Sequence, residues 1–463
     1  MALERPDALP AWAEDCFARI SPLIYGVNES LWGFAEPSGA EHRSAGLLAR
    51  VLRENGFSVR ENVSGRPTAF VAAYGAGRPV IGFLGEFDAL PGLSQQAGVP
   101  APAPVTEGGF GHGCGHCALG SGSLAAAIMV RRYLEEHRLP GTVRYYGCCD
   151  EEVDGVKPLM ARDGEFDDVD CVFSWHPGSE TGVPNSELAA MQSFQVVFTP
   201  EGEAPADATV DACELMNVAV NYLREHVSPD VRISYAHVDA DAPVPVRQRG
   251  RTTLAYTVRA PRAREVREVL QRVVACAQGA GLMTDTASRI VMKSGYADRF
   301  QNHVAAQILS DAARDVGAPK WDEADYALAR AFLAQYGPQQ QRTVREMIAR
   351  KYPGEPAQAV LDRPLDPLVE PFNPEVCRRS GASSDVGDVG YATPTASMRV
   401  ACAALGTPAH SWFMTGMIAS SIGKKGIACA AEILSVAAIR VYRRPELLDG
   451  AQAERLRKIG GTN

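Results

Sequence analysis

The stretch GFGHGCGHCALG, residues 109–120, gathers two histidines, two cysteines and five glycines within twelve positions. Thiolate and imidazole groups are good ligands for borderline transition-metal ions, and glycines let the backbone turn tightly around them. Cys114 and His116 therefore fit a metal site, although they also fit a glycine-rich turn with incidental side chains. A redox pair or a cysteine nucleophile is less favoured, and nothing here matches the cysteine signature of papain-like enzymes.

A second group is the acid pair Glu151 and Glu152, which follows the apolar run GTVRYYGC. A solvated strand end is the commoner role of such a pair. At a metal site, however, two adjacent carboxylates can divide the work. One binds the ion, and the other takes a proton from the activated water and returns it to the leaving group. Further candidates stand in comparable positions: Glu86 and Asp88 in GEFDALPG, His176 in SWHPG and His410 in GTPAHSW.

The segments that must position these side chains alternate between strand and helix. The apolar runs PVIGFLGE, GTVRYYGC and DCVFSW are typical of buried strands, and HRSAGLLARVLRENGF and GSGSLAAAIMVRRYLEEH are typical of helices. This order predicts an α/β catalytic domain, a mostly parallel sheet flanked by helices. Each strand delivers its polar cluster at its carboxyl end, where open α/β sheets bind ligands.

The pattern changes near residue 190. Strand, helix, two strands and helix follow, which fits a small α+β module, and after about residue 300 the chain returns to helices and apolar glycine-rich segments. We therefore predict three segments: residues 1–190, the first part of the catalytic domain; residues 191–300, an inserted lid and dimerisation domain; and residues 301–463, the second part of the catalytic domain.

Composition limits the partners of the chain. The 463 residues carry a formal net charge of −9, which argues against nucleic acid or an anionic membrane as the main partner. We see no signal peptide and no apolar run of membrane-spanning length, so we expect a cytoplasmic protein. The eleven cysteines lie mostly in apolar runs and do not indicate a disulfide framework.

Taken together, seven segments resemble the aminoacylase/carboxypeptidase superfamily of metal-dependent hydrolases, and within it the amidohydrolase branch. They follow in the same order: GEFDALPGLSQ, GHGCGHCALG, GCCDEE, SWHPG, ELMNVAVNYLREHV, SSDVGDVGYATPT and LGTPAHSW. The resemblance implies a lid that forms a homodimer or higher oligomer, a small aromatic or N-acyl amino acid substrate, and one or two Zn²⁺ or Mn²⁺ ions in each copy of the chain. It implies these metal ligands: Cys114, His116, Glu152, His176 and His410.

The resemblance also implies roles beside the ligands. Glu151 is the expected general base, and Asp88 is the acid expected to orient a metal-bound histidine. Glu86 stands where related branches keep another ligand, and we expect it, like Asp385, to support the ligands from behind.

The predicted lid departs from the family. Relatives carry a histidine near the start of the lid that is thought to bind the amide carbonyl as it becomes an oxyanion. The matching stretch here, FTPEGEAPADATVDACELMN, has no histidine, and DAPVPVRQ lacks an asparagine usual in relatives. Loss of an oxyanion donor costs on the order of 10²–10³ in rate, so we expect a donor from elsewhere, such as Arg247, or a different substrate.

Three functions follow from these observations. The favoured one is hydrolysis of an amide of an aryl or N-acyl amino acid. The second is hydrolytic deamination of an activated aromatic amine of the 5-nitroanthranilate type, which releases ammonia and involves no amide carbonyl. The third is a catalytically inactive metal-binding homologue.

Overall fold

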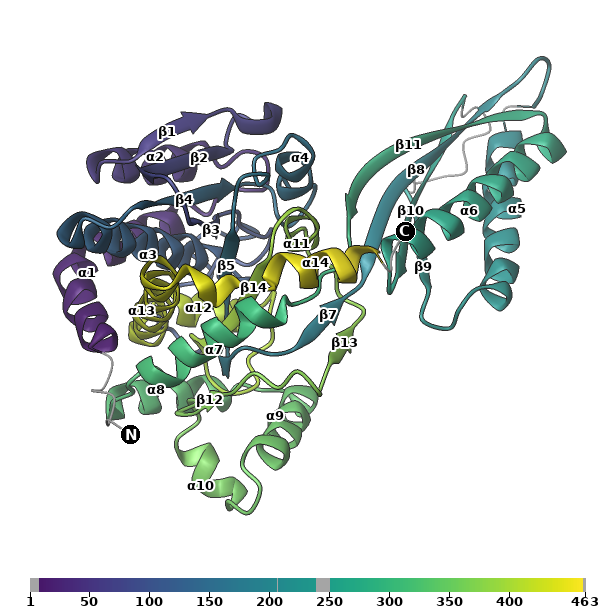
Figure 1. The fold of residues 1–463 in the computed structure, drawn as a ribbon. Helices are drawn as coiled ribbons and strands as arrows, with labels where there is room; N and C mark the ends of the chain where they lie inside the picture. The colour runs from purple at the N-terminus through teal and green to yellow at the C-terminus, as the bar shows by residue number, and fades with distance from the viewer. Residues whose placement is uncertain (1–7, 206, 239–249, 461–463) are drawn as a thin grey trace. The chain divides into compact units, whose positions relative to one another are not determined.

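The computed structural model describes residues 8–205, 207–238 and 250–460, and it falls into two compact units (Figure 1). Unit 1 comprises Met1–Asn185, Gln301–Cys377 and Ala392–Leu456, and unit 2 comprises Ser186–Phe300, Arg378–Tyr391 and Arg457–Asn463. Among the described residues, no helix is both long enough and apolar enough to cross a membrane.

Unit 1 is built on a sheet of eight strands in the order β1-β2-β4-β3-β5-β14-β6-β12. Its four middle strands, β4, β3, β5 and β14, are parallel, and antiparallel neighbours follow on both sides. The expected α/β domain is thus confirmed, with antiparallel strands added towards its edges. The strands are β1 (Ser58–Glu61), β2 (Phe70–Ala76), β3 (Val80–Glu86), β4 (Gly141–Cys148), β5 (Cys171–Gly178), β6 (Thr181–Gly182), β12 (Val369–Glu370) and β14 (Thr395–Ala401).

Helices flank this sheet, and three of the longest, α1, α3 and α13, pack against one another (Figure 1). Strands covered in this way read as continuous apolar runs, and every residue of β3 is buried. The helices of unit 1 are α1 (Leu9–Phe34), α2 (His42–Glu54), α3 (His116–His137), α4 (Lys157–Arg162), α7 (His303–Val316), α8 (Glu323–Leu333), α9 (Pro338–Lys351), α10 (Ala357–Asp362), α12 (Trp412–Ile418) and α13 (Ser421–Arg443); α14 (Ala451–Gly460) begins in it.

Helix α3 lies unusually close to the sheet because two of its residues are glycines. A Cβ on Gly120 would lie 2.7 Å from the carbonyl oxygen of Glu86, and one on Gly122 would lie 2.6 Å from the ring of Trp175. Neither distance leaves room for a methyl group. The close approach brings the first turn of α3, with His116, to the carboxyl ends of β3 and β5.

Unit 2 contains a four-stranded antiparallel sheet in the order β11-β8-β10-β9, with α5 and α6 packed on it. Its strands alternate between buried and partly exposed residues, as expected for a sheet with one covered face, and their buried side chains form one apolar core with those of the two helices. The expected sheet-containing second domain is confirmed. Its elements are β7 (Ser186–Leu188), β8 (Ala190–Pro200), α5 (Ala208–Leu223), β9 (Arg232–His237), β10 (Thr252–Ala260), α6 (Ala263–Thr284), β11 (Thr286–Tyr296) and β13 (Arg378–Ser380), with α11 (Val386–Ala392) at its end.

Candidate metal centre

The glycine-rich loop before α3 takes a path that other residues could not follow. A Cβ on Gly111 would lie 1.9 Å from the carbonyl oxygen of Leu93. Gly115, which caps the N-terminus of α3, has a φ of +84°, a left-handed conformation that glycine adopts at little cost. The glycines therefore fix a tight turn that carries Cys114 to the start of α3, directly before His116.

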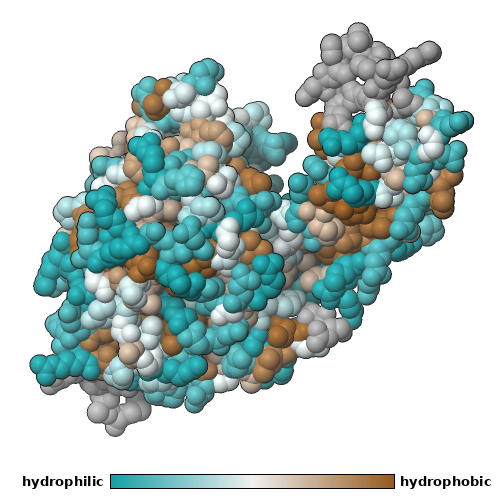
Figure 2. Space-filling model, turned by 90° about the horizontal axis from the view of Figure 1, so that it is seen from above, coloured by the Kyte–Doolittle hydropathy of each residue, from teal (hydrophilic) through white to brown (hydrophobic). Residues whose placement is uncertain are grey.

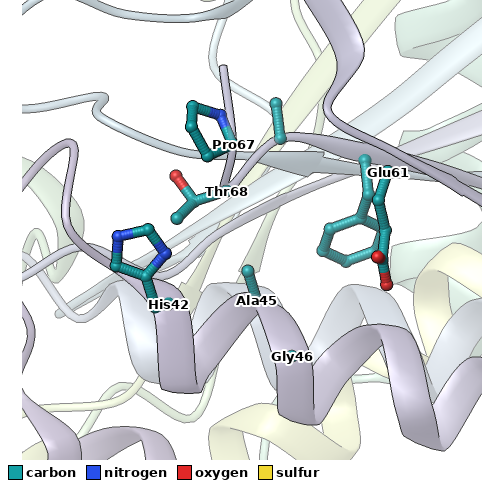
Figure 3. Close-up of a pocket in the computed structure, with 8 residues that line it drawn as sticks. His42, Ala45, Gly46, Glu61, Pro67 and Thr68 are labelled. Atoms are coloured by element: carbon teal, nitrogen blue, oxygen red, sulfur yellow. The ribbon is translucent and has the colours of Figure 1, made fainter.

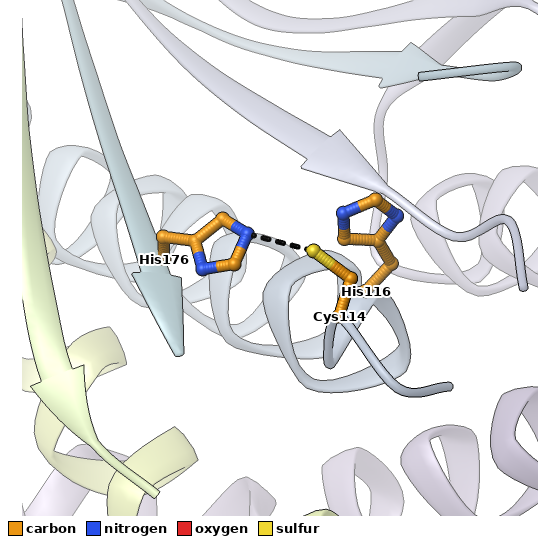
Figure 4. Close-up of side chains that lie close together, drawn as sticks. All are labelled: Cys114, His116 and His176. Carbon is orange, nitrogen blue, oxygen red and sulfur yellow. Dashed lines mark hydrogen bonds between the residues drawn. The ribbon is translucent and has the colours of Figure 1, made fainter. Parts of the chain in front are cut away.

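Cys114, His116 and His176 converge from this loop, from α3 and from β5 (Figure 4). The Cys114 Sγ atom lies 3.3 Å from Nε2 of His176. Each residue offers a ligand atom within 4.8 Å of the other two. The Nδ1–H of His176 donates to the carbonyl oxygen of Pro177 at 2.8 Å, which leaves Nε2 turned towards the sulfur. Three of the five predicted metal ligands thus lie together.

Cys114 also belongs to a second group, with Glu152 and His410. The His410 Nε2 atom lies 3.5 Å from a carboxylate oxygen of Glu152. His410 has a left-handed φ of +53°, and its amide donates to the carbonyl oxygen of Gly113 at 2.9 Å, which joins its loop to the cysteine loop. Its side chain is 55% exposed, whereas that of Glu152 is 8% exposed, so the centre is open to solvent beside His410.

A third group surrounds Nε2 of His116, the ring nitrogen that faces the centre. The Nε2 atom lies 3.3 Å from Glu86, 3.8 Å from Glu151 and 3.9 Å from Glu152. The three carboxylates come from the ends of two neighbouring strands, β3 and β4. The arrangement gathers negative charge around one buried imidazole.

Asp88 connects the metal-ligand candidates to the backbone of the acid pair. One carboxylate oxygen lies 2.7 Å from Nδ1 of His116. The other accepts the amide of Glu152 at 2.9 Å and the hydroxyl of Ser38 at 2.8 Å. A carboxylate at Nδ1 fixes the ring so that Nε2 faces the centre, as is common for metal-bound histidines.

The titration behaviour of these groups follows from their burial and charge. Burial raises the pKa of the Cys114 thiol to about 12 and lowers the pKa of His176 to about 4. Burial would also lower the pKa of His116, but Cys114 and Asp88 raise it well above its ordinary range. Without a bound cation, Cys114 and His116 therefore keep protons that a metal ion would displace, whereas His176 is already neutral.

The donor set fits a divalent transition-metal ion. Among the described residues, Nε2 of His116 and Oε1 of Glu152 are buried polar atoms that make no hydrogen bond, and both face this centre. Buried polar groups are rarely left without a partner, and a metal ion would supply one to both atoms. Thiolate, imidazole and carboxylate ligands together suit zinc and, through the nitrogen and oxygen donors, manganese.

Residues 82–343 match the profile of Peptidase family M20/M25/M40. The chain belongs to this family. It is 34% identical over 441 residues to one of the subunits of p-aminobenzoyl-glutamate hydrolase from Escherichia coli (strain K12), and the match covers 92% of this chain and 91% of that protein. It is 26% identical to the Xaa-Arg dipeptidase of Mus musculus, over 56% of this chain and 60% of the dipeptidase.

Solved structures share the fold, and one of them is described as a member of the M20 family. A dinuclear metal binding peptidase of Bacillus subtilis matches with a TM-score of 0.57 and 14% identity over 92% of this chain and 99% of that one. The aminobenzoyl-glutamate utilization protein of Klebsiella pneumoniae matches with a TM-score of 0.59 and 14% identity over 93% of this chain and 99% of that one. The family resemblance read from the sequence and the expected metal-dependent amidohydrolase class are thus confirmed.

The structure places most of the predicted M20 site residues in one cluster within unit 1. The predicted supporting residue Asp385 is a buried residue of unit 2, on the segment Arg378–Tyr391, which begins with β13. Arg247, predicted to bind substrate, lies outside the described residues. The roles of both residues stay predictions. These predicted residues share the cluster: Glu86, Asp88, Cys114, His116, Glu151, Glu152, His176 and His410.

Sequence reasoning missed a buried lysine at the centre. Lys157, at the start of α4, is fully buried, and its ammonium lies 2.7 Å from Glu86. Burial alone would raise the pKa of Glu86, and the Lys157 charge lowers it. A lysine in the sequence is usually exposed, so only the apolar neighbours in GVKPLM could have indicated its burial.

Sequence reasoning also passed over the Cys-x-x-Cys spacing of Cys114 and Cys117. Both cysteines are free, and Cys117 is fully buried on α3, while the Cys114 sulfur faces His176. This placement supports a metal-ligand role for Cys114 and leaves Cys117 as a small apolar core residue.

A separate cavity of about 120 Å³ lies between α2 and the segment that leads into β2 (Figure 3). None of its lining residues belongs to the metal cluster. They are His42, Ala45, Gly46, Glu61, Pro67, Thr68, Ala69 and Phe70.

Proposed function

We propose that this M20 hydrolase cleaves the amide bond of an aryl or N-acyl amino acid with the aid of one or two divalent metal ions. The observation that carries the proposal is the acid pair Glu151–Glu152 beside thiolate and imidazole donors. The chain is also 34% identical to a subunit of a p-aminobenzoyl-glutamate hydrolase. The name of that relative supplies the substrate class, a carboxylate-bearing amide.

The residues that would hold the metal divide into two groups that share Cys114. One is Cys114, His116 and His176, and the other is Cys114, Glu152 and His410. The shared thiolate supports a pair of ions, Zn²⁺ or Mn²⁺, over a single one. When bound, such ions polarise the scissile carbonyl and lower the pKa of water beside it.

Glu151 would carry the proton. It lies beside the ligand candidates without being needed in either group that shares Cys114, and its side chain is 15% exposed, so water and substrate reach it. Its carboxylate would accept a proton from the attacking water as the C–O bond forms. It would then deliver that proton to the amide nitrogen as the C–N bond breaks, so that the products are a carboxylic acid and an amine.

Hydrolytic deamination is the second candidate, and the altered lid favours it. The segment from the end of β8 through α5 contains no histidine to bind a carbonyl oxygen. An activated aryl amine has no amide carbonyl and would not need that group. Its product, ammonia, separates the two functions.

The test compares wild type with Glu151→Gln on p-aminobenzoyl-glutamate, hippurate and an amino-nitrobenzoate, with released amine and ammonia assayed separately. Glu151→Gln should keep its metal and lose at least a hundredfold in kcat, since general bases contribute 10²–10⁴ in rate. The control Glu165→Gln changes a partner of Arg60 that is 15% exposed, as Glu151 is, and its activity should stay within twofold of wild type. Activity of Glu151→Gln within tenfold of wild type would rule out the assignment, and protein that binds no zinc or manganese would indicate an inactive homologue.

We also propose that unit 2 forms a homodimer. Val218 and Tyr222 of α5 are 52% and 65% exposed and lie one helical turn apart. Large apolar side chains on one exposed helix face are typical of protein interfaces.

A further inference from the structure

The backbone on the amino side of Glu151 is held by a buried glutamate from a distant part of the chain. Glu41, which directly precedes α2, is fully buried, and its Oε1 atom accepts the amide of Asp150 at 2.7 Å. The same oxygen accepts the amide of Gly39 at 3.0 Å. The other oxygen accepts the hydroxyl of Thr68, also buried, at 3.0 Å. The Glu41 carboxylate is therefore fixed at both oxygens.

The backbone on the carboxyl side of Glu151 is held by the same loop, through Asp88. The amide of Glu152 donates to Oδ2 of Asp88, and the Ser38 hydroxyl, three residues before Glu41, donates to that same oxygen. The amides immediately before and after Glu151 thus both donate to buried carboxylates. One short segment, residues 38–41, is involved in both contacts: Glu41 is one of these carboxylates, and Ser38 donates to the other, Asp88.

Asp150 needs such a restraint because its backbone is in an uncommon conformation. Its φ is +63°, in the left-handed region that few residues other than glycine adopt. Its carbonyl oxygen accepts the amide of Gly155 at 2.6 Å, so the turn is also closed from its far end. Conformations of this kind persist at functional sites only where the surroundings determine them. The φ of Asp150 decides the direction in which the next residue, Glu151, leaves β4.

We propose that Glu41 is a positioning residue that sets the orientation of the Glu151 carboxylate at the metal centre. The proposal rests on the proposed role of Glu151 as proton carrier. Glu41 belongs to none of the ligand groups, and its link to the acid pair runs through the Asp150 amide. Its loss should therefore lower the rate of proton transfer and leave metal binding and substrate affinity nearly unchanged.

The loop offers a matched control in Glu36. Its carboxylate accepts hydrogen bonds from the amides of Arg43 and Ser44 at 2.9 and 2.8 Å, so its bonds go to the first turn of α2 and not to the amides of the acid pair. Glu41→Leu and Glu36→Leu should both lower the melting temperature. Only Glu41→Leu should lower kcat, by roughly 10²-fold, the order of loss that a 1 Å misplacement of a catalytic group causes. Its KM should stay within about threefold of wild type, and its zinc stoichiometry should be unchanged.

Two further variants refine the test. Glu41→Gln keeps one carbonyl oxygen for the two amides, while the Thr68 hydroxyl can turn to accept, so kcat should return to within tenfold of wild type. Thr68→Val removes one restraint on Glu41 and should lower kcat threefold to tenfold, which keeps the test valid if Glu41→Leu does not fold. Hydrogen exchange of a peptide over residues 148–156 should be faster in Glu41→Leu and Thr68→Val and unchanged in Glu36→Leu.

Equal kcat and equal exchange in Glu41→Leu and Glu36→Leu, or an unchanged Thr68→Val, would overturn the proposal. Failure of the proposed function looks different, because Glu151→Gln would then stay active whatever Glu41 does. An inactive Glu151→Gln with a fully active Glu41→Leu would refute the positioning role alone.

Discussion

Asp88→Asn gives the sharpest test of how the centre is organised. Asp88 is 1% exposed, and its two oxygens serve different partners: Nδ1 of His116 on one side, the Glu152 amide and the Ser38 hydroxyl on the other. An asparagine has one acceptor oxygen and one NH₂ group. If the asparagine NH₂ faces Glu152, it opposes the backbone N–H of Glu152, and neither group can accept a hydrogen bond. If it faces His116, the ring is pushed towards the tautomer whose Nε2 carries a proton and cannot bind metal.

The expected cost follows from these bonds and from the pKa of the carboxyl. Burial would raise the pKa of Asp88, but His116 lowers it to about 2, from an ordinary value near 3.8. At 1.36 kcal/mol per unit, this shift stabilises the metal-free fold by about 2 kcal/mol. A hydrogen bond to a charged group contributes ~1.5–3 kcal/mol, which agrees. We therefore expect Asp88→Asn to lose about 2 kcal/mol of unfolding free energy at pH 7.

The sign of the pH dependence is fixed by the direction of the shift. A carboxyl with a lowered pKa stabilises the fold above its unfolded pKa, near 4, and loses this effect as pH falls through 4 towards 2. The difference between wild type and Asp88→Asn should therefore be largest between about pH 5 and pH 6 and shrink below pH 4 as Asp88 gains a proton. It should also shrink as pH rises above about 6.5, because the pKa of His116 is raised by Asp88 and this contribution is lost when His116 gives up its proton. Metal affinity should fall 10- to 100-fold, the usual cost of losing a carboxylate behind a ligand histidine.

The assay is competition for zinc against a chromophoric chelator, together with urea unfolding of the metal-free protein. Asp366→Asn is the control, because Asp366 is also fully buried and accepts Tyr352 and the amide of Thr181 at 2.7 and 3.0 Å. It should lose stability and keep its zinc affinity. Zinc affinity of Asp88→Asn within threefold of wild type would refute the reasoning that Asp88 orients His116.

Three other changes test separate parts of the structure. Cys114→Asp should keep part of the metal and part of the activity, as measured by elemental analysis and turnover, whereas a covalent substrate adduct on the wild-type sulfur would show a nucleophile instead of a ligand. Gly111→Ala should lower the bound metal by more than half, because its Cβ would meet the Leu93 carbonyl at 1.9 Å; full metal content would contradict the tight turn. Val218→Asp on α5 should convert a dimer to a monomer in light scattering, and an unchanged mass would exclude this face as the interface.

The positions of the site residues were predictable because they depend on strand direction. Apolar runs that end in acids or histidines indicate parallel strands, and the carboxyl ends of such strands meet at one edge. Glu86 and Glu151–Glu152 follow this rule, since β3 and β4 pair in parallel register with Glu86 opposite Cys148. The antiparallel pairing of β2 with β4 was not predictable, because the apolar pattern of a buried strand does not show whether it pairs parallel or antiparallel with its neighbour.

The residues behind the site were not predictable for a different reason. Lys157 and Glu41 are residue types that are almost always exposed, and their burial depends on partners 71 and 109 residues away in the chain. The left-handed backbone of Asp150 and of His410 likewise leaves no mark in the sequence, since neither is glycine. Sequence patterns report the periodicity of whole elements, whereas these features depend on single long-range contacts.

The charges around His116 favour a cation at this centre. Glu86, Asp88, Glu151 and Glu152 bring four carboxylates to one buried imidazole, and the Lys157 ammonium offsets the charge of Glu86. Uncompensated buried charge is costly, so the metal-free protein holds extra protons, as the raised pKa of His116 shows. A divalent ion held by these residues would displace these protons and offset the negative charge. The acid pair that Glu41 and Asp88 hold in place would thus serve both the proposed metal binding and the proposed proton transfer.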